Sequence, residues 1–219
     1  MIRRRNLTLG CTAQRAKIAS ETGRVEARYD EAAMSASMFT NFPTLRARLV
    51  LAAAEAGHHD ETVTLLDELA PNDFEAVGRG WLTTVSLGSV AWGVVTVDAH
   101  AHAVVLRRLL GEYTGLIARL SSGTDVMCAY DRLLAGVAAV DGDHPEADRL
   151  FAAALAQEEA LRAPPLVTRT KHWWGRALLR RGEYERGRPL LADARASAEC
   201  LGMLAVVSQV DDLLAALPS

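Results

Sequence analysis

Four short turns recur along the chain at nearly equal intervals. They are centred on Gly57, Asp98, Gly142 and Gly182, at separations of 41, 44 and 40 residues. A glycine just past a helix end adopts the left-handed conformation that closes the helix. Each unit is therefore predicted to be a helix, a tight turn and a second helix. A period of about 40 residues is typical of helical repeats, in which stacked hairpins bury one another's apolar faces.

The segments between these turns favour helices. Between Pro145 and Leu161 apolar residues recur every three or four positions, and Asp143 and Glu146 have the spacing of a capping box. Ala, Leu, Arg and Glu, all strong helix formers, dominate most of the chain. The pattern predicts an all-α fold with further helices at 44–56, 60–70, 80–97, 100–112, 125–141, 165–181, 184–201 and 203–217.

Three regions follow from this pattern. Residues 1–43 are expected to form an N-terminal tail and a first helical hairpin, in which "GRVEARYDEAAMSAS" favours a helix. Residues 44–202 hold the repeats. Residues 203–219 are expected to form a C-terminal capping helix, whose apolar stripe would also permit a homodimer if it were exposed. The stripe consists of Val206, Val210, Leu213, Leu214 and Leu217.

Residue identities around the turns point to one family. Relative to Gly142, residues Ala147, Phe151 and Ala154 take the positions where small side chains let two helices approach and an aromatic ring fills the gap. Around Gly182 the pattern matches in part, with Gly175 and Gly187 at the positions for small residues.

With "LLDELAPNDFEAV", "AGVAAVDGDHPEADRLFAAALAQEEAL" and "RTKHWWGRALLRRGEYERG", residues 45–203 resemble the tetratricopeptide-like (MalT-like) C-terminal regions of large bacterial ATPase regulators of the LuxR-type and adenylate-cyclase-linked kinds. The resemblance implies a right-handed α-solenoid of tetratricopeptide-like hairpins that senses partners or small ligands. The chain has no GxxxxGK[ST] phosphate loop and no cyclase module, so we expect a cut-out region or a stand-alone relative of such regulators.

Composition argues against several partners. The net charge of −3 and the isoelectric point near 6.1 offer no basic footprint, so no direct contact with nucleic acid is expected. Cys11, Cys128 and Cys200 are an odd number without a CxxC pair, which favours a reducing cytoplasm. The uncharged run at 80–97 is long enough to span a membrane, but eight of its 18 residues are Gly, Ser or Thr. It is therefore predicted to be a buried helix.

Neither a catalytic site nor a metal site is predicted. Asp98, His100 and His102 lie close together in sequence, but positions two apart diverge on a helix, and no HExxH or CxxC spacing supports a metal. His58 and His59 are expected to be solvated turn residues. The adjacent pairs Glu158–Glu159 and Asp211–Asp212 are expected on exposed helix faces. We therefore expect no cofactor.

The concave groove of a solenoid is the remaining candidate site. Counting back from the turns places Arg169, His172, Arg176 and Arg180 of the last repeat on the groove side. Arg132 comes from the repeat before. Trp92 and Thr96 come from the one before that. A cationic wall facing a tryptophan is suited to an anionic, partly apolar ligand such as a peptide carboxylate.

Two classes of function follow. The first is a non-enzymatic binding or regulatory protein that engages a peptide, a protein or a small anionic molecule in the groove. The second is a biosynthetic enzyme that polarises a substrate with Arg and His and holds it on tryptophan faces. A truncated regulator that merely folds is a third possibility. Surface arginines are usually solvated and tryptophans usually fill cores, so the groove competes with plain packing.

Overall fold

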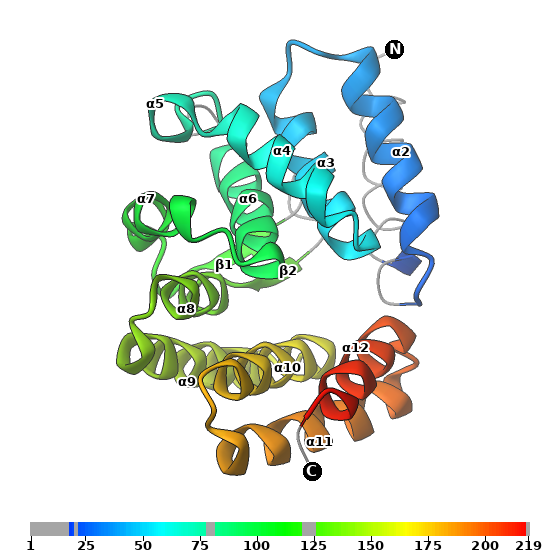
Figure 1. The fold of residues 1–219 in the computed structure, drawn as a ribbon, viewed down its shortest axis with the longest axis vertical. Coiled ribbons are helices and arrows are strands. Elements are labelled where there is room, and N and C mark those ends of the chain that lie inside the picture. The colour runs from blue at the N-terminus through cyan, green and yellow to red at the C-terminus, as the bar shows by residue number, and fades with distance from the viewer. Residues whose placement is uncertain (1–17, 20–21, 78–81, 120–125, 218–219) are drawn as a thin grey trace.

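The computed structural model describes residues 18–19, 22–77, 82–119 and 126–217 (Figure 1). The prediction of an all-α protein is confirmed, with one small antiparallel sheet as the exception. The elements with described bounds are α2 (Val25–Met38), α3 (Pro43–Ala56), α4 (His59–Leu69), α5 (Pro71–Phe74), α6 (Thr83–Val97), α7 (His100–Gly111), β1 (Ile117–Arg119), β2 (Val126–Ala129), α8 (Tyr130–Asp141), α9 (His144–Ala160), α10 (Pro164–Arg180), α11 (Tyr184–Leu201) and α12 (Leu204–Ala215).

All four predicted turns close hairpins. They join α3 to α4, α6 to α7, α8 to α9 and α10 to α11. Gly57, Gly142 and Gly182 have φ angles of 80°, 87° and 81°, and Asp98 has a φ of 56°. Such left-handed residues end a helix, and Asp is one of the few side chains that tolerates the conformation. The helix bounds agree with the predicted ones within two residues, apart from those at 80–97 and 125–141.

The hairpins pack in the order of the chain. Their first helices α3, α6, α8 and α10 contact one another in sequence, and the second helices α4, α7 and α9 each contact the first helix of the next hairpin. At the C-terminal end, α12 packs on α11 and α10. Figure 1 shows α2 and α12 near each other, and a methyl group at Gly23 would lie 3.8 Å from Cβ of Leu204. The start of α2 therefore lies beside the start of α12.

The apolar stripe of α12 is used within the chain. Val206 and Val210 are buried in a small cluster with Met203. Leu179 of α10 and Leu191 and Ala198 of α11 complete it. The remaining members of the stripe, Leu213, Leu214 and Leu217, pack against the same cluster. The surface that we expected to support a homodimer is therefore largely occupied by this protomer's own helices.

The uncharged run at 80–97 lies at the centre of the fold. Residues 80–81 are outside the described residues, and α6 begins at Thr83. Every residue of α6 from Val85 to Val95 is buried, as expected, and α6 packs against α3 and α8. Of the helices that the structure describes, none is long and apolar enough to cross a membrane.

The predicted helix at 125–141 is wrong at its start. Residues Val126–Ala129 form β2, which pairs with β1, and the helix begins only at Tyr130. The apolar run "VMCAY" is equally suited to a buried strand and a buried helix, so its periodicity could not decide between them. The expectation that Glu158 is exposed is also wrong, because the backbone N–H of Ala129 in β2 donates to its carboxylate and the residue is fully buried.

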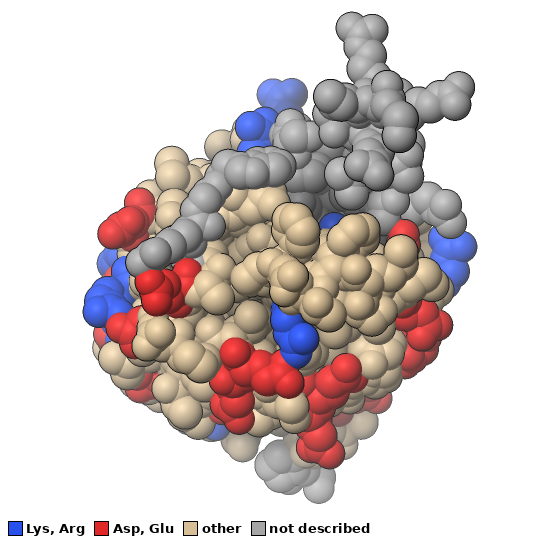
Figure 2. Space-filling view, turned by 90° about the horizontal axis from the view of Figure 1, so that it is seen from above, with Lys and Arg blue, Asp and Glu red and all other residues tan. Residues whose placement is uncertain are grey.

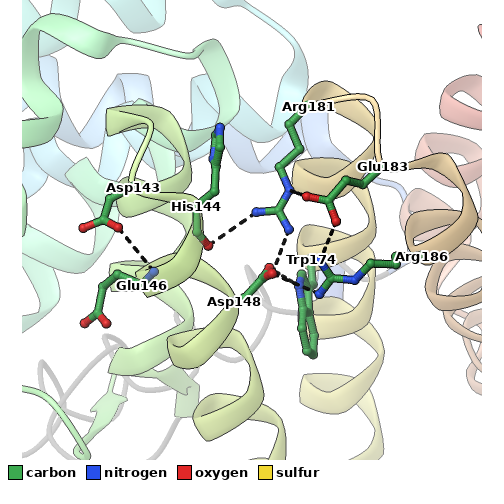
Figure 3. Close-up of polar contacts among 8 residues, drawn as sticks. All are labelled: Asp143, His144, Glu146, Asp148, Trp174, Arg181, Glu183 and Arg186. Atoms are coloured by element: carbon green, nitrogen blue, oxygen red, sulfur yellow. Dashed lines mark hydrogen bonds and ion pairs between the residues drawn. The ribbon is translucent and has the colours of Figure 1, made fainter.

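The junction of α9, α10 and α11 is organised by Asp148 (Figure 3). Its carboxylate accepts hydrogen bonds from Trp174 Nε1 at 2.8 Å, Arg181 Nη2 at 2.7 Å and Arg186 Nη2 at 2.9 Å. Burial raises the pKa of Asp148, but these hydrogen bonds outweigh it and hold the pKa below its ordinary value. Trp174 also stacks on Phe151, with 6.0 Å between ring centroids. Trp174 is therefore a packing residue.

Exposed apolar side chains gather at the end where α2 meets α3. Met34, Met38, Phe39 and Phe42 are each at least half exposed. Seen from this end, uncharged side chains cover much of the face, and acidic side chains gather along its border (Figure 2).

Helices α10 and α11 approach most closely at two glycines. A methyl group at Gly175 would lie 2.6 Å from Cγ of Leu191 and 3.2 Å from the carbonyl oxygen of Gly187. A methyl group at Gly187 would lie 3.1 Å from the carbonyl oxygen of Gly175. No larger residue fits at either position without moving a helix, so these are the small positions of the last hairpin.

We expect Gly175→Val to lower the free energy of unfolding by about 2–3 kcal/mol, because overpacking forces the two helices apart. Gly111→Val is the matched control. A methyl group at Gly111 meets nothing within 4 Å, so its effect should stay within about 0.5 kcal/mol. Urea unfolding followed by circular dichroism measures both. Equal effects of the two substitutions would contradict the close approach.

Candidate ligand-binding pocket

A cavity of about 490 Å³ lies where α6, α10 and α12 meet the turn between α3 and α4. Six of the seven predicted groove residues line it. Those six are Trp92, Thr96, Arg169, His172, Arg176 and Arg180. The repeat register therefore brings residues that are far apart in sequence to one cavity.

The seventh residue, Arg132, lies behind the wall and is fully buried. Its guanidinium donates to the carbonyl oxygens of Met127 at 3.0 Å and Leu166 at 3.2 Å. Its Cζ lies 5.6 Å from the ring centroid of Trp92 and 5.7 Å from that of Trp173, within cation–π distance. Arg132 therefore supports the pocket wall from behind and has no surface in the cavity.

Glu158 of α9 supplies the counter-charge. Arg132 Nη1 lies 4.0 Å from Glu158 Oε1, and neither side chain is exposed. Oε1 accepts from the backbone N–H of Ala129 at 3.0 Å, and Oε2 accepts from Thr170 Oγ1 at 2.5 Å. A buried ion pair is tolerated when the remaining polar atoms find partners. Here β2 and α10 provide them for both Glu158 oxygens and both terminal nitrogens of Arg132, whereas Arg132 Nε has no partner among the described residues.

Two tryptophans form the apolar wall. Trp92 of α6 and Trp173 of α10 meet edge to face with 4.7 Å between ring centroids, and both line the cavity. The Cζ atom of Arg169 lies 5.4 Å from the Trp92 ring centroid. Trp173 was not among the predicted site residues. Trp173 lines the cavity beside Trp92, a contact between two distant helices that its sequence position does not show.

Arg176 and Arg180 connect α10 to the end of α6. Arg176 Nη2 donates to the carbonyl oxygens of Val95 at 3.1 Å and Thr96 at 2.8 Å, and Arg180 forms an ion pair with Asp98. Cations at a helix C-terminus satisfy the last carbonyl groups and oppose the helix dipole. Burial, and then the charge of Arg180, lowers the pKa of Arg176 to about 10. Both arginines thus have a structural role beside any role in binding.

His172 is the most perturbed titratable group of the wall. Its side chain is buried, and Nδ1 has no hydrogen-bond partner among the described residues. Burial, and then the charges of Arg176, Arg169 and Arg132, lowers its pKa to about 3. The imidazole is therefore neutral at physiological pH. A neutral ring can donate or accept a hydrogen bond but is a weak base.

The other side of the cavity comes from the hairpin of α3 and α4 and from α12. Ala54, Glu55 and His59 line it from the first hairpin, and Glu55 is in an ion pair with Arg28. Helix α12 adds further residues that the sequence could not place at the site, because they arrive only through the return of α12 toward α3. They are Gln209, Asp212, Leu213 and Ala216.

Two other histidines, His58 and His102, lie beside acidic side chains. His102 Nε2 lies 2.9 Å from Asp67 Oδ1, and His58 lies near Glu26 and Glu61. Asp98, which we had considered with His100 and His102, pairs with Arg180 instead. Within residues 18–19, 22–77, 82–119 and 126–217, no three His, Cys, Asp or Glu side chains are grouped as metal ligands.

A second cavity of about 450 Å³ opens beside the hairpin turns and shares Trp173, Arg176 and Arg180 with the first. Its remaining arginine, Arg181, is held by Asp148. Arg169 and His172 do not line it, so the larger cavity collects more of the polar groups of α10. We therefore take the larger cavity as the candidate site.

Comparison of the chain with protein families, with curated proteins and with solved structures found no match. What the pocket binds must therefore be inferred from its own side chains. The resemblance to tetratricopeptide-like regulators stays a prediction.

The buried His172 should make folding sensitive to acid. Its pKa in the folded state, about 3, is below the value of about 6.5 in the unfolded chain. Below pH 6.5 the unfolded state therefore binds a proton that the native state does not, and stability falls as the pH drops toward 3. The loss should approach about 1.4 kcal/mol per pH unit for this one group.

Urea unfolding at pH 7, 5.5 and 4.5 measures this dependence. His172→Gln should remove that part of the slope, whereas His100→Gln, which changes an exposed ring, should keep it. If His172→Gln and the original protein lose stability in parallel, His172 is not buried in its neutral form.

Proposed function

We propose that the protein is a non-enzymatic, tetratricopeptide-like binding protein that holds a small anionic, partly apolar ligand or a peptide carboxylate in the pocket on α10. The observation that carries the proposal is the convergence of three α10 guanidinium groups, two tryptophans and a neutral histidine on one cavity of about 490 Å³. Cavities of this size suit small organic ligands.

The order of helix contacts supports a stack of helical hairpins, as a tetratricopeptide-like superhelix requires. First helices contact first helices, and each second helix contacts the next hairpin. The small residues Gly175 and Gly187 lie where the hairpin helices approach most closely, as in tetratricopeptide repeats. In such a superhelix the first helices line the concave face, and the first helices α3, α6 and α10 supply most of the pocket lining.

The donors on Arg176 favour an anion. Both of its hydrogen bonds to α6 come from Nη2, so the N–H groups on Nε and Nη1 remain for a ligand. Its lowered pKa reflects a charge that is partly desolvated and faces another cation, Arg180. A carboxylate or phosphate would supply the counter-charge through charge-assisted hydrogen bonds, which are about twice as strong as neutral ones.

The remaining lining favours an apolar part of the ligand. Trp92 and Trp173 present ring surface, and Ala54, Leu213 and Ala216 present aliphatic surface. Aromatic walls with few, well-placed polar groups are typical of sites for small molecules. A purely inorganic anion would leave this surface in contact with water, so an organic anion is the better match.

An enzyme is the second candidate, and His172 is the observation that favours it, because strongly shifted pKa values gather at catalytic sites. The direction of the shift argues against it. General acids and bases work best with a pKa near the working pH, and a histidine with a pKa of about 3 is a poor base there. Of the nearby carboxylates, Glu55 and Asp98 are engaged in ion pairs. We therefore rank binding above catalysis.

The biological role that ligand binding serves is a further proposal. A regulatory role, control of a protein partner and a cytoplasmic location all stay predictions from the sequence. Cys128 is buried and Cys200 is exposed, and neither is in a disulfide, as a reducing compartment requires.

Replacing Arg176 should weaken ligand binding. We expect Arg176→Met to lower the affinity for the probe 3-phenylpropanoate at least about tenfold, because a hydrogen bond to a charged group contributes about 1.5–3 kcal/mol. Isothermal titration calorimetry measures the affinity, and circular dichroism checks the fold. The variant should also melt earlier, because two carbonyl groups at the end of α6 lose their donor.

Arg107→Met separates these two effects. Arg107 of α7 binds Asp141 and Asp143 at another hairpin turn and does not line the pocket. It should cost stability without changing affinity. If the two variants bind the probe equally well, the proposed role of Arg176 is wrong.

A further inference from the structure

The charged groups of the pocket are divided between its elements. All three guanidinium groups come from α10, through Arg169, Arg176 and Arg180. The carboxylates come from elsewhere, Glu55 from the end of α3 and Asp212 from α12. The cavity therefore has a basic side and an acidic side. A ligand with a single negative charge would use only the basic side.

The two carboxylates differ in what they already bind. Glu55 is in an ion pair with Arg28, and both side chains are largely buried. Asp212 is exposed, and its carboxylate has no ion-pair or hydrogen-bond partner among the residues described. Its neighbour Asp211 points to α11 instead, where it accepts from Arg195 Nε at 2.5 Å. Asp212 is thus the carboxylate that remains for a ligand.

Gln209 adds a second acceptor beside it. Gln209 and Asp212 are three residues apart on α12, so they lie on the same helix face, and both line the cavity. A side-chain amide oxygen and a carboxylate are the acceptors that an ammonium group needs for its N–H donors. The Asp212 carboxylate would repel a purely anionic ligand.

We propose that the ligand is zwitterionic, with a carboxylate that binds the α10 arginines and an ammonium group that binds Asp212 and Gln209. This inference rests on the proposed function and adds to it the second half of the ligand. Amino acids and short peptides with a free N-terminus share this chemistry, and their side chains would lie against Trp92 and Trp173. Because Asp212 belongs to α12, the bound ligand would also join the C-terminal helix to α10.

Matched probes test the ammonium group alone. L-Phenylalanine and 3-phenylpropanoate differ only in that group, and the dipeptide Phe-Ala and its N-acetyl form differ in the same way at greater length. Calorimetry should give the original protein a tighter affinity for the member with the ammonium group in at least one pair. The pair with the larger difference in affinity shows whether the ligand is a free amino acid or a peptide.

Asp212→Asn keeps the shape of the side chain and removes its charge. It should weaken binding of the ammonium-bearing probe by at least about threefold, the effect of one exposed ion pair. Binding of 3-phenylpropanoate should stay equal or become tighter, because a repulsive charge is gone. Asp211→Asn removes the same charge from the same helix outside the pocket, and it should change neither affinity.

The possible negative results distinguish a failure of this inference from a failure of the proposed function. If 3-phenylpropanoate binds and the ammonium group adds nothing in either pair, the zwitterion is excluded while the proposed function stands. The same holds if Asp212→Asn weakens all probes alike. If no probe binds, both the proposed function and this inference are wrong.

Discussion

The fully buried guanidinium of Arg132 is the interaction on which the rest of the structure depends. Moving such a charge out of water costs several kcal/mol. That cost is offset only where neighbouring groups accept its hydrogen bonds and balance its charge. Carbonyl oxygens accept from it, Glu158 balances its charge and the rings of Trp92 and Trp173 lie beside it. These partners come from β2, α6, α9 and α10. One side chain therefore fixes the relative positions of three hairpins.

The pocket follows from this arrangement. The tryptophans that face Arg132 on one side form the apolar wall of the cavity on the other. The charge of Arg132 also adds to those of Arg176 and Arg169 in lowering the pKa of His172 and keeping the ring neutral. The same buried arginines thus contribute to the packing of the fold and to the electrostatics of the pocket. An anionic ligand would then lower the electrostatic cost that the fold already carries.

Much of the fold could be predicted because it is local. Left-handed residues such as Gly142 and Asp98 end helices whatever lies around them, and the repeat period then assigns each helix a register. That register was enough to bring Trp92 and Arg176 to one cavity. It could not show that Arg176 also holds the end of α6, because that contact joins residues about 80 positions apart.

The parts that could not be predicted are non-local. The strand β2 exists because it pairs with β1 and covers Glu158, and its sequence alone is equally suited to a helix. Asp212 reaches the pocket only because the chain curves until α12 meets the first hairpin. Hydrophobic periodicity identifies the buried face of an element. It does not identify the distant element that packs there.

The most direct test is the ¹H–¹⁵N spectrum of the tryptophan indoles during titration with 3-phenylpropanoate. Trp92 and Trp173 line the pocket, whereas Trp174 is bound to Asp148 outside it, and single Trp→Phe variants assign the signals. An anion site in this pocket predicts that the Trp92 and Trp173 signals move with the probe and that the Trp174 signal stays. Signals that do not move at saturating probe, or that all move equally, would contradict it.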